Sequence, residues 1–325
     1  MTISNFQCVK EFNRAFDMVT KDPKEYIGYE EDTNGFIKIN PYKYVRSKVL
    51  VSHSLMRLRL NLIKEEIEEL NDAIKMNDMK ETRDAIGDIL YVVYGMADIF
   101  GFDIDYIFSK TLQTEVFRYY LDNNINTINN INNINDTKHT DNINTIYIDK
   151  IISASSNGSK TISNFNYIKL FSDELLGSDK KAVTFKSIVS KINDLYLKLE
   201  QECQNETIVF DDEHNNSKNS IETKIIIISH YIYNLLKYTY LLAIMYTIDA
   251  DSDFTIIHES NMSKLCDTEQ DAKDTVADYE IKYKNGKSPY DSPYYYELPE
   301  LKKWIVKNKS SGKALKNIKY KEVTF

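Results

Sequence analysis

The segments Lys64-Glu-Glu-Ile-Glu-Glu69 and Glu81-Thr-Arg-Asp-Ala-Ile-Gly-Asp88 hold two acidic clusters that lie close together in the chain. Apolar residues recur every three or four positions through 47–76 and again through 78–100, which predicts one helix for each cluster. A short turn at 75–78 would place the two helices side by side and antiparallel. We therefore predict an all-α fold for the body of the chain.

Carboxylates are concentrated on particular faces of these two helices, because side chains three, four or seven positions apart share a face. The residues concerned are Glu65, Glu66 and Glu69 on the first helix, and Glu81, Asp84 and Asp88 on the second. Carboxylates that converge repel one another unless a cation lies among them, and Mg²⁺ prefers oxygen ligands, with Mn²⁺ as an alternative. The pattern predicts a metal site that binds phosphate. For Glu68 and Asp72 we prefer an ordinary solvated helix face.

Asp88 is the most informative of these acidic residues, because the helix around it is nearly all apolar. A carboxylate in such a place is at least partly buried and needs a partner. Gly87 costs the helix about 1 kcal/mol relative to alanine, which the close approach of another backbone or of a ligand would explain. Ion pairing with Arg57, Arg59 or Arg83 is the main alternative to a metal.

The composition narrows the class of protein. The chain has 325 residues, of which 42% are hydrophobic, and a net charge of −8, so it can bury a core but offers no dense basic surface for nucleic acid. Three widely spaced cysteines, and an N-terminus without a signal-peptide pattern, fit a reducing cytoplasm. The apolar run 225–248 could span a bilayer by its length, but Lys237 would be costly there, so we predict a buried core helix and no membrane contact.

The low-complexity repeat Asn-Asn-Ile-Asn divides the chain, because it lacks the apolar diversity to build a core. We predict four parts: a first helical repeat at 1–121, a disordered linker at 122–166, a second helical repeat at 167–284 and a tail at 285–325. In the tail, Trp304-Ile-Val306 and Ala314-Leu315 flank a loop that contains glycine, which predicts a small β-hairpin. Proline and glycine predict a long loop at 22–44.

The second helical repeat matches the first at one constant offset. Tyr94 recurs as Tyr240, Ala97 as Ala243, Asp103 as Asp249 and Asp105 as Asp251. This predicts an internal duplication, although two unrelated amphipathic helices with similar ends would give the same pattern. The second copy has Asn234 in place of Asp88 and no Glu-Glu-x-x-Glu, so as a copy it has lost the metal ligands.

Another set of polar residues lies near the end of the second repeat. His258, Asn261 and Lys264 follow one another at intervals of one helical turn. An amide can read a base edge or a sugar, and a lysine can neutralise phosphate. Taken alone the motif is weak, since such residues usually decorate a solvated helix surface.

Together these motifs resemble the all-α NTP pyrophosphohydrolases, a superfamily with MazG-like enzymes, dimeric dUTPase and dCTPase types, and phosphoribosyl-ATP pyrophosphohydrolases. The matching pieces are Glu11-Phe-Asn-Arg-Ala-Phe16, Leu58–Glu69, Asp84–Gly95, Gly101-Phe-Asp-Ile-Asp105 and His258-Glu-Ser-Asn-Met-Ser-Lys264. The occurrence of all five pieces in this order identifies the superfamily more specifically than any single piece does. The resemblance implies a MazG-like helical bundle that oligomerises.

The resemblance also implies a set of site residues. The superfamily's Glu-Glu-x-x-Glu element falls on Glu65, Glu66 and Glu69, and the aspartate of its Glu-x-x-Asp element falls on Asp88. The position three before Asp88 is Ala85 instead of glutamate, so Asp84 or Glu81 is expected to substitute. The candidate substrate-binding residues are His258, Asn261, Lys264 and Arg59.

The implied reaction is Mg²⁺-dependent cleavage of a nucleoside triphosphate between the α and β phosphates, which gives a monophosphate and pyrophosphate. Glu65 or Glu66 would orient or deprotonate the attacking water, and Lys264 would offset the phosphate charge. The base and sugar stay open among dUTP, dCTP, a damaged nucleotide and phosphoribosyl-ATP. A non-catalytic nucleotide-binding or scaffold protein on the same fold is the alternative, in view of Ala85.

The distribution of motifs suggests how such a site would be assembled. The first half keeps the carboxylates, while the Ser-Asn-Met-Ser-Lys element occurs only in the second half. We therefore expect one complete site built from both halves, as in a covalent pseudo-dimer, with a homo-oligomer as the other possibility.

Overall fold

The computed structural model describes residues 4–16, 18, 28–31, 37–40, 51, 53–109, 111–112, 115–116, 163–176, 183–204 and 218–325. The predicted linker lies outside the described residues as far as 162, and the helix α8, Asn164–Leu170, begins before the expected linker end at 166. The described part is mostly helical, which confirms the all-α class.

The first half is built on a pair of antiparallel helices, α4 (His53–Met76) and α5 (Met79–Phe100). Asn77 adopts a left-handed φ of 55° in the connecting turn, and the Asp78 side chain caps α5 by accepting from the backbone N–H groups of Lys80 and Glu81. At the other end Gly101 takes the left-handed conformation that ends a helix. Both boundaries agree with the sequence prediction.

Further helices complete the bundle. In the first half α1, Asn5–Ala15, crosses α5, and the second half contains α9 (Ser172–Leu176), α10 (Phe185–Gln204), α11 (Lys218–Met245) and α12 (Ala250–Met262), in addition to α8. Most of the apolar run expected in the core lies within α11, where Ile228, Ile232 and Leu236 are fully buried. None of the helices in the described ranges is long and apolar enough to cross a membrane.

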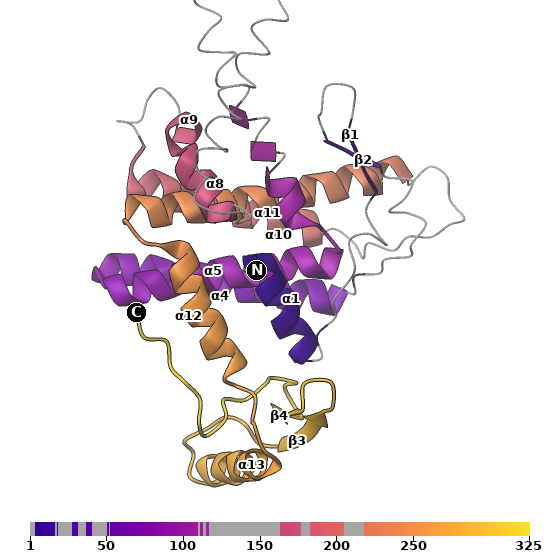
Figure 1. Cartoon of the computed structure of the whole chain (residues 1–325), viewed down its shortest axis with the longest axis vertical. Helices are drawn as coiled ribbons and strands as arrows, with labels where there is room; N and C mark the ends of the chain where they lie inside the picture. The colour runs from indigo at the N-terminus through magenta and orange to yellow at the C-terminus, as the bar shows by residue number, and fades with distance from the viewer. Residues whose placement is uncertain are drawn as a thin grey trace, which may run out of the picture.

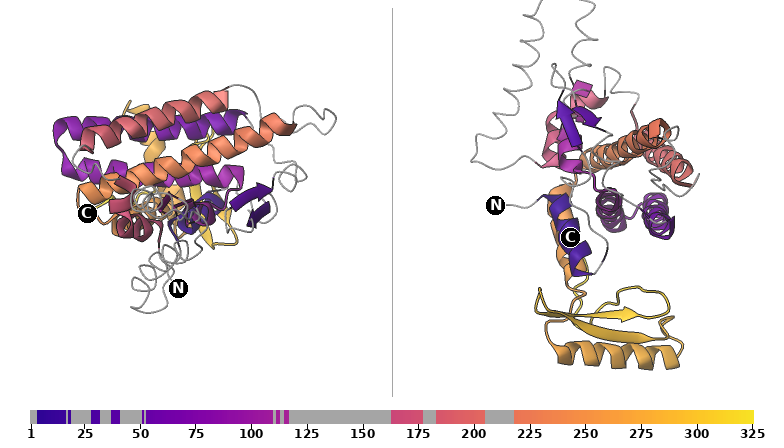
Figure 2. Two further views of the ribbon diagram at one scale, coloured as in Figure 1. Left: turned by 90° about the horizontal axis from the view of Figure 1, so that it is seen from above. Right: turned by 90° about the vertical axis from the view of Figure 1, so that its right-hand side faces the viewer.

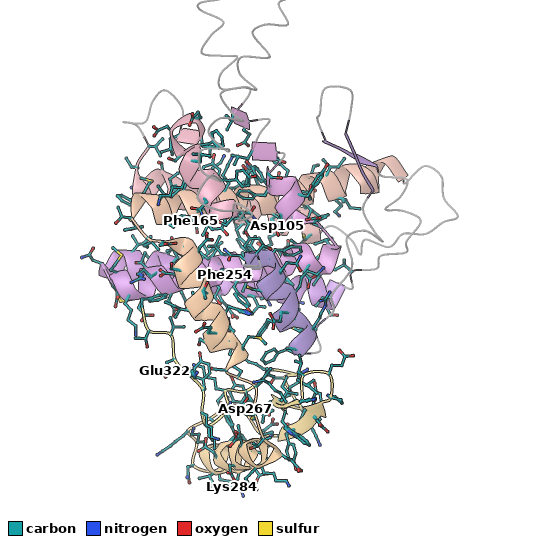
Figure 3. The ribbon with its side chains drawn as sticks, viewed as in Figure 1. Asp105, Phe165, Phe254, Asp267, Lys284 and Glu322 are labelled. Atoms are coloured by element: carbon teal, nitrogen blue, oxygen red, sulfur yellow. The ribbon has the colours of Figure 1, made fainter. Side chains whose placement is uncertain are left out.

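The two halves meet at matched tyrosines. Tyr94 of α5 and Tyr240 of α11, 146 positions apart, share a hydrogen bond of 2.8 Å between their hydroxyls. Each ring also meets a phenylalanine of the opposite half: Phe254 lies edge-on to Tyr94, and Phe108 lies edge-on to Tyr240. Figure 3 labels Phe254 close to this contact. Reciprocal contacts of this kind are typical of an interface with twofold symmetry.

A second reciprocal set of contacts surrounds the tyrosines. Asn5 donates to Tyr240 Oη (3.1 Å) and to Asp251 (3.0 Å), while Asn164 donates to Tyr94 Oη (2.9 Å) and to Asp105 (2.8 Å). The residues that follow the two matched helices also correspond, since Gly101 after α5 and Thr247 after α11 both take left-handed φ values. These equivalences support the predicted duplication and the description of the bundle as a pseudo-dimer.

The helix α12 lies against α5 because Gly87 leaves room for it. A Cβ atom on Gly87 would come 2.1 Å from Cδ1 of Ile257. The close approach expected from the sequence is therefore that of α12. The packing brings the end of α12, with its polar residues from the second half, onto the helix that carries Asp88.

Two small β-hairpins accompany the helices. β1 (Gly28–Glu31) pairs with β2 (Ile37–Asn40), inside the segment that was expected to be a loop, so that prediction was wrong there. At the C-terminal end β3 (Pro293–Leu298) pairs with β4 (Lys303–Asn308). The C-terminal hairpin was predicted, but its turn lies between these strands, and the glycine loop leads only to an isolated bridge from Lys307 to Ala314.

The helix α13, Glu269–Lys284, packs against β3 and β4 and forms with them a C-terminal unit. Figure 1 shows α12 leading from the bundle to this unit, and the right-hand view of Figure 2 shows α13 beneath the hairpin. Ile305 of the unit packs with Ala15, Phe16 and Leu265, which ties the unit to the ends of α1 and α12. The boundary expected at 284 thus falls within a packed unit.

Candidate active site

The acidic residues of α4 and α5 come together as the sequence indicated. Glu66 is partly buried and its pKa is raised to about 8, by burial first and then by the negative charges of Asp88 and Glu69. The pKa of Asp88 is raised to about 7, by burial and by Asp84, against the opposing charge of Lys264. Burial also raises the pKa of Asp84. Three carboxyl groups therefore lie near one another, and their environment disfavours their ionised form.

Among the described residues, no arginine serves as a counterion for these carboxyl groups. Arg83 instead makes two hydrogen bonds to Asp253 of α12, at 2.8 and 2.5 Å. Within the described ranges no lysine or arginine lies in ion-pair distance of Glu66, Asp84 or Asp88. Oδ1 of Asp84 is buried and has no hydrogen-bond partner. The charge of the cluster is thus left for something else to neutralise.

The other acidic residues that the sequence singled out on these helices are exposed. Glu65, Glu69 and Glu81 lie at the open side of the cluster. Farther round the helix, Glu68 lies 3.8 Å from Lys64 and Asp72 lies 2.8 Å from Lys75, and all four side chains are more than half exposed. For Glu68 and Asp72 this is the solvated face that we expected.

The cluster fits a hard divalent cation by its chemistry. It supplies carboxylate oxygens only, and an orphaned buried oxygen and raised pKa values are what a missing positive charge would leave behind. As placed, the side chains do not form a closed shell: no group of three His, Cys, Asp or Glu in the described part of the chain converges at metal-binding distances. Rotation of Glu66, Glu69 and Asp84 about their side-chain bonds would be required.

Lys264 reaches the carboxylates from the second half of the chain. It follows α12, donates to Oδ1 of Asn261 at 2.6 Å, and places its ammonium group 5.8 Å from the centre of the Phe12 ring. Burial lowers its pKa, while the charges of Asp88 and Glu66 raise it. The structure thus brings Asn261 and Lys264 to the acidic cluster, as the hypothesis of one site from two halves requires.

His258 lies one turn earlier on α12. Its Nδ1 is 3.0 Å from the hydroxyl of Tyr91, on α5 one turn beyond Asp88, and its Nε2 is 3.9 Å from Glu11. Burial lowers the pKa of His258, so the ring is neutral at pH 7. The residue adjoins the cluster through Tyr91, and within the described ranges it makes no hydrogen bond to the carboxylates of Glu66, Asp84 or Asp88.

Arg59 does not join this set. It is only 4% exposed and donates to Oδ1 of Asn13 at 3.2 Å, and Asn13 donates in turn to Asp98 at 2.7 Å. Gly95 makes room for the guanidinium group, since a Cβ there would lie 2.5 Å from Nη1. Because a buried cation needs a nearby anion, Asp98 accounts for this position. The structure gives Arg59 a role in the core and not the expected place beside a substrate.

The equivalent position in the second half is filled by other side chains. Asn234, which matches Asp88, donates to the backbone oxygen of His230 at 2.8 Å. Beside it Lys237 forms an ion pair with Glu115 at 2.9 Å. At the duplication offset Lys237 corresponds to Tyr91, so a partly buried ion pair replaces the open acidic cluster here. Of the two equivalent positions, only the one in the first half has the acidic cluster within the described ranges.

Two cavities of the described part lie elsewhere. One of about 330 Å³ is lined by residues of α4 and α10, among them Arg57 and Glu200, and one of about 780 Å³ lies between α1 and the turn of the C-terminal hairpin. Neither is lined by Glu66 or Asp88. We assign the site by its carboxylates and by Lys264, because charged groups can stabilise a phosphate chain and its metal ion.

Sequence reasoning missed two lysines beside the cluster, Lys313 and Lys316. Lys316 acts electrostatically on Asp84, on Asp88 and on Lys264, and Lys313 acts on Lys264. Neither lies in a motif, and only the fold brings the C-terminal segment back to α5.

Comparison with known proteins bears on the same helices. Residues 44–114 match the family model for phosphoribosyl-ATP pyrophosphohydrolase, a family within the MazG-like all-α NTP pyrophosphohydrolase superfamily. The resemblance seen in the sequence is thereby confirmed for the segment that contains α4 and α5, and it points to a nucleotide pyrophosphohydrolase.

Beyond this segment the comparisons are less informative about chemistry. The chain is 28% identical over 322 residues to the uncharacterized protein L479 of Acanthamoeba polyphaga mimivirus, an alignment that covers 99% of this chain and 94% of the relative. The two proteins are therefore similar along their whole length, including the part that follows α5. No solved structure was found to match the chain.

Proposed function

We propose that this protein is a Mg²⁺-dependent nucleoside triphosphate pyrophosphohydrolase that cleaves the bond between the α and β phosphates. The observation that carries the proposal is the proximity of Lys264, from the other half of the chain, to Glu66 and Asp88, which form no ion pair with the lysines and arginines that the structure describes. A divalent cation would neutralise the two carboxylates, and a polyphosphate would neutralise Lys264. The family match to residues 44–114 supports the same reaction class.

The roles of the residues follow from their positions. Glu66, Glu69, Asp84 and Asp88 would hold the metal, with Glu81 at the exposed edge as an alternative ligand. When bound, Mg²⁺ (or Mn²⁺) supplies charge neutralisation at the phosphate oxygens and a lower pKa for a bound water. Glu65 is exposed and free to turn toward that water, so it is our choice for orienting it, with Glu66 as the second candidate.

The residues from the second half would hold the substrate. Lys264 donates to Oδ1 of Asn261, so the amide N–H groups of Asn261 would be the atoms that donate to a sugar or base. Lys264 itself offsets phosphate charge. His258 borders the same place through Tyr91 and would contact the nucleoside as a neutral ring.

Pyrophosphate release from a panel of nucleotides, with Mg²⁺ and with EDTA, tests the proposal. The panel contains dUTP, dCTP, a damaged nucleotide and phosphoribosyl-ATP. We expect Mg²⁺-dependent release from at least one of them and loss of at least a hundredfold in Asp88→Asn, with Glu68→Gln as an exposed control on α4 that keeps full activity. Absence of release from every nucleotide would contradict the proposal.

A second candidate is a nucleotide-binding or scaffold protein without catalysis. It is favoured by Ala85, which stands where the superfamily has a glutamate, and by the open arrangement of the carboxylates. Nucleotide binding without pyrophosphate release would establish it. For either function a cytoplasmic location is consistent with the three free cysteines, Cys8, Cys203 and Cys266.

A further inference from the structure

The last residues of the chain, 313–325, form a segment that we call the C-terminal strap. It is fixed alongside the end of α12 by hydrogen bonds to successive residues there. Tyr320 Oη lies 2.8 Å from Oγ of Ser260, the backbone N–H of Lys321 donates to Oγ of Ser263 at 3.0 Å, and Asn317 donates to the backbone oxygen of Ser263 at 2.9 Å. The strap therefore runs directly beside the segment that carries Asn261 and Lys264.

The far end of the strap is held at the start of α5. The ring of Phe325 lies 4.4 Å from the guanidinium carbon of Arg83, the residue before Asp84. Val323 and Phe325 also pack against the main hydrophobic core. Figure 1 shows this segment rising from the C-terminal unit to the bundle, and Figure 3 labels Glu322 on that path. The end of the strap thus lies at the residue that precedes Asp84 in the chain.

Two lysines of the strap act electrostatically on the site. The side chains of Lys313 and Lys316 are exposed, and the Lys316 ammonium group lies 4.2 Å from the ring centre of Tyr320. The positive charges of both lower the pKa of Lys264, and that of Lys316 also lowers the pKa of Asp84 and Asp88. Lys316 is therefore close to both sides of the site.

The charges of the site are separated into two groups. Glu66, Asp84 and Asp88 form the acidic group, and Lys264, Lys313 and Lys316 form the basic group, without an ion pair between the groups in the described part of the chain. Three lysines close to one another repel, and an anion of several charges relieves that repulsion. A polyphosphate that carries a divalent cation has the right charge for each group.

We propose that Lys313 and Lys316 of the C-terminal strap, together with Lys264, bind the polyphosphate chain of the substrate. This inference rests on the proposed function and identifies the part of the protein that recognises the phosphates leaving as pyrophosphate. The strap lies outside the matched segment 44–114, so it is a feature of the longer chain. Specificity for triphosphates over monophosphates then comes from the strap.

The test is the binding of inorganic triphosphate in the presence of Mg²⁺, measured by titration calorimetry on the full chain. We expect wild-type protein to bind it and Lys313→Ala/Lys316→Ala to bind it at least about tenfold more weakly, since hydrogen bonds to charged groups are worth that much. The variant Lys313→Ala/Lys316→Arg, which has a positive charge at position 316 again, should recover most of the affinity. Lys321→Ala is the matched control, because its side chain is exposed on the same strap and only its backbone is bonded.

The outcomes separate the two proposals. Equal binding by wild type and the double variant overturns the role of the strap, while Mg²⁺-dependent turnover in the panel would leave the proposed function standing. A loss shared by Lys321→Ala also overturns it, because the effect would then be one of general charge. If wild-type protein neither binds triphosphate nor releases pyrophosphate, both proposals fail.

Discussion

Replacement of Asp88 by asparagine should stabilise the metal-free protein at alkaline pH, although it removes a proposed ligand. In the folded chain the pKa of Asp88 is raised from its ordinary 3.8 to about 7. One pKa unit corresponds to about 1.4 kcal/mol, so ionised Asp88 costs the folded state at most about 4 kcal/mol. Because the side chain is partly exposed, solvent screening reduces the expected cost to about 1–3 kcal/mol.

The sign of the pH dependence follows from the direction of the shift. Between pH 4 and 7 the folded state holds a proton on Asp88 that the unfolded state has lost, so the free energy of unfolding falls as the pH rises. Glu66, with a pKa raised to about 8, extends the same trend. At about pH 2, below both pKa values, the carboxyl is protonated in both states, and Asp88→Asn should differ little from wild type.

The assay is urea denaturation in EDTA at several pH values. We expect Asp88→Asn to gain about 1–3 kcal/mol over wild type at pH 8, by the screened estimate above. Mg²⁺ at a hundred times its dissociation constant should stabilise wild type by about 2.7 kcal/mol and the variant much less. Destabilisation of metal-free Asp88→Asn at pH 8 would refute the reasoning, because it would mean that the carboxylate already has a favourable partner.

Two further predictions concern the packing that places the site. Gly87→Ala should lower the free energy of unfolding by about 1–3 kcal/mol in urea denaturation, because its Cβ would overlap Ile257. Adding Ile257→Ala to this variant should recover part of the loss, and an unchanged unfolding midpoint in Gly87→Ala would contradict the contact. Tyr94→Phe and Tyr240→Phe should each cost about 1–2 kcal/mol, since each removes a hydroxyl with two reciprocal partners, and unequal losses that differ severalfold would argue against the symmetric interface.

The sequence was a good guide where local rules and tertiary packing agree. Asp78 and Gly101 bound α5 as a helix cap and a left-handed stop, and both signals are local. The predicted duplication rested on a constant offset, and Tyr94 and Tyr240, which match at that offset, occupy reciprocal places in the core. The acidic cluster could be predicted because residues three, four or seven positions apart share a face of α4 or of α5.

Other features depend on contacts between distant parts of the chain. Arg59 looked available for substrate because Asn13 and Asp98, which surround it, lie far away in sequence. Lys316 had no motif, and its place beside Asp84 is set by the hydrogen bonds of the strap. The hairpin turn was misplaced because Gly312 gave a stronger turn signal than the actual turn, where Lys302 takes a left-handed φ.

The central claim is that one divalent cation binds between α4 and α5 and faces Lys264. Anomalous scattering from crystals of the full chain soaked with Mn²⁺ and a slowly hydrolysed triphosphate analogue tests it most directly. The account predicts a single strong peak within bonding distance of Glu66 and Asp88, with phosphate density toward Lys264 and the strap. Bound nucleotide with its manganese elsewhere, or without any peak at these carboxylates, would contradict it.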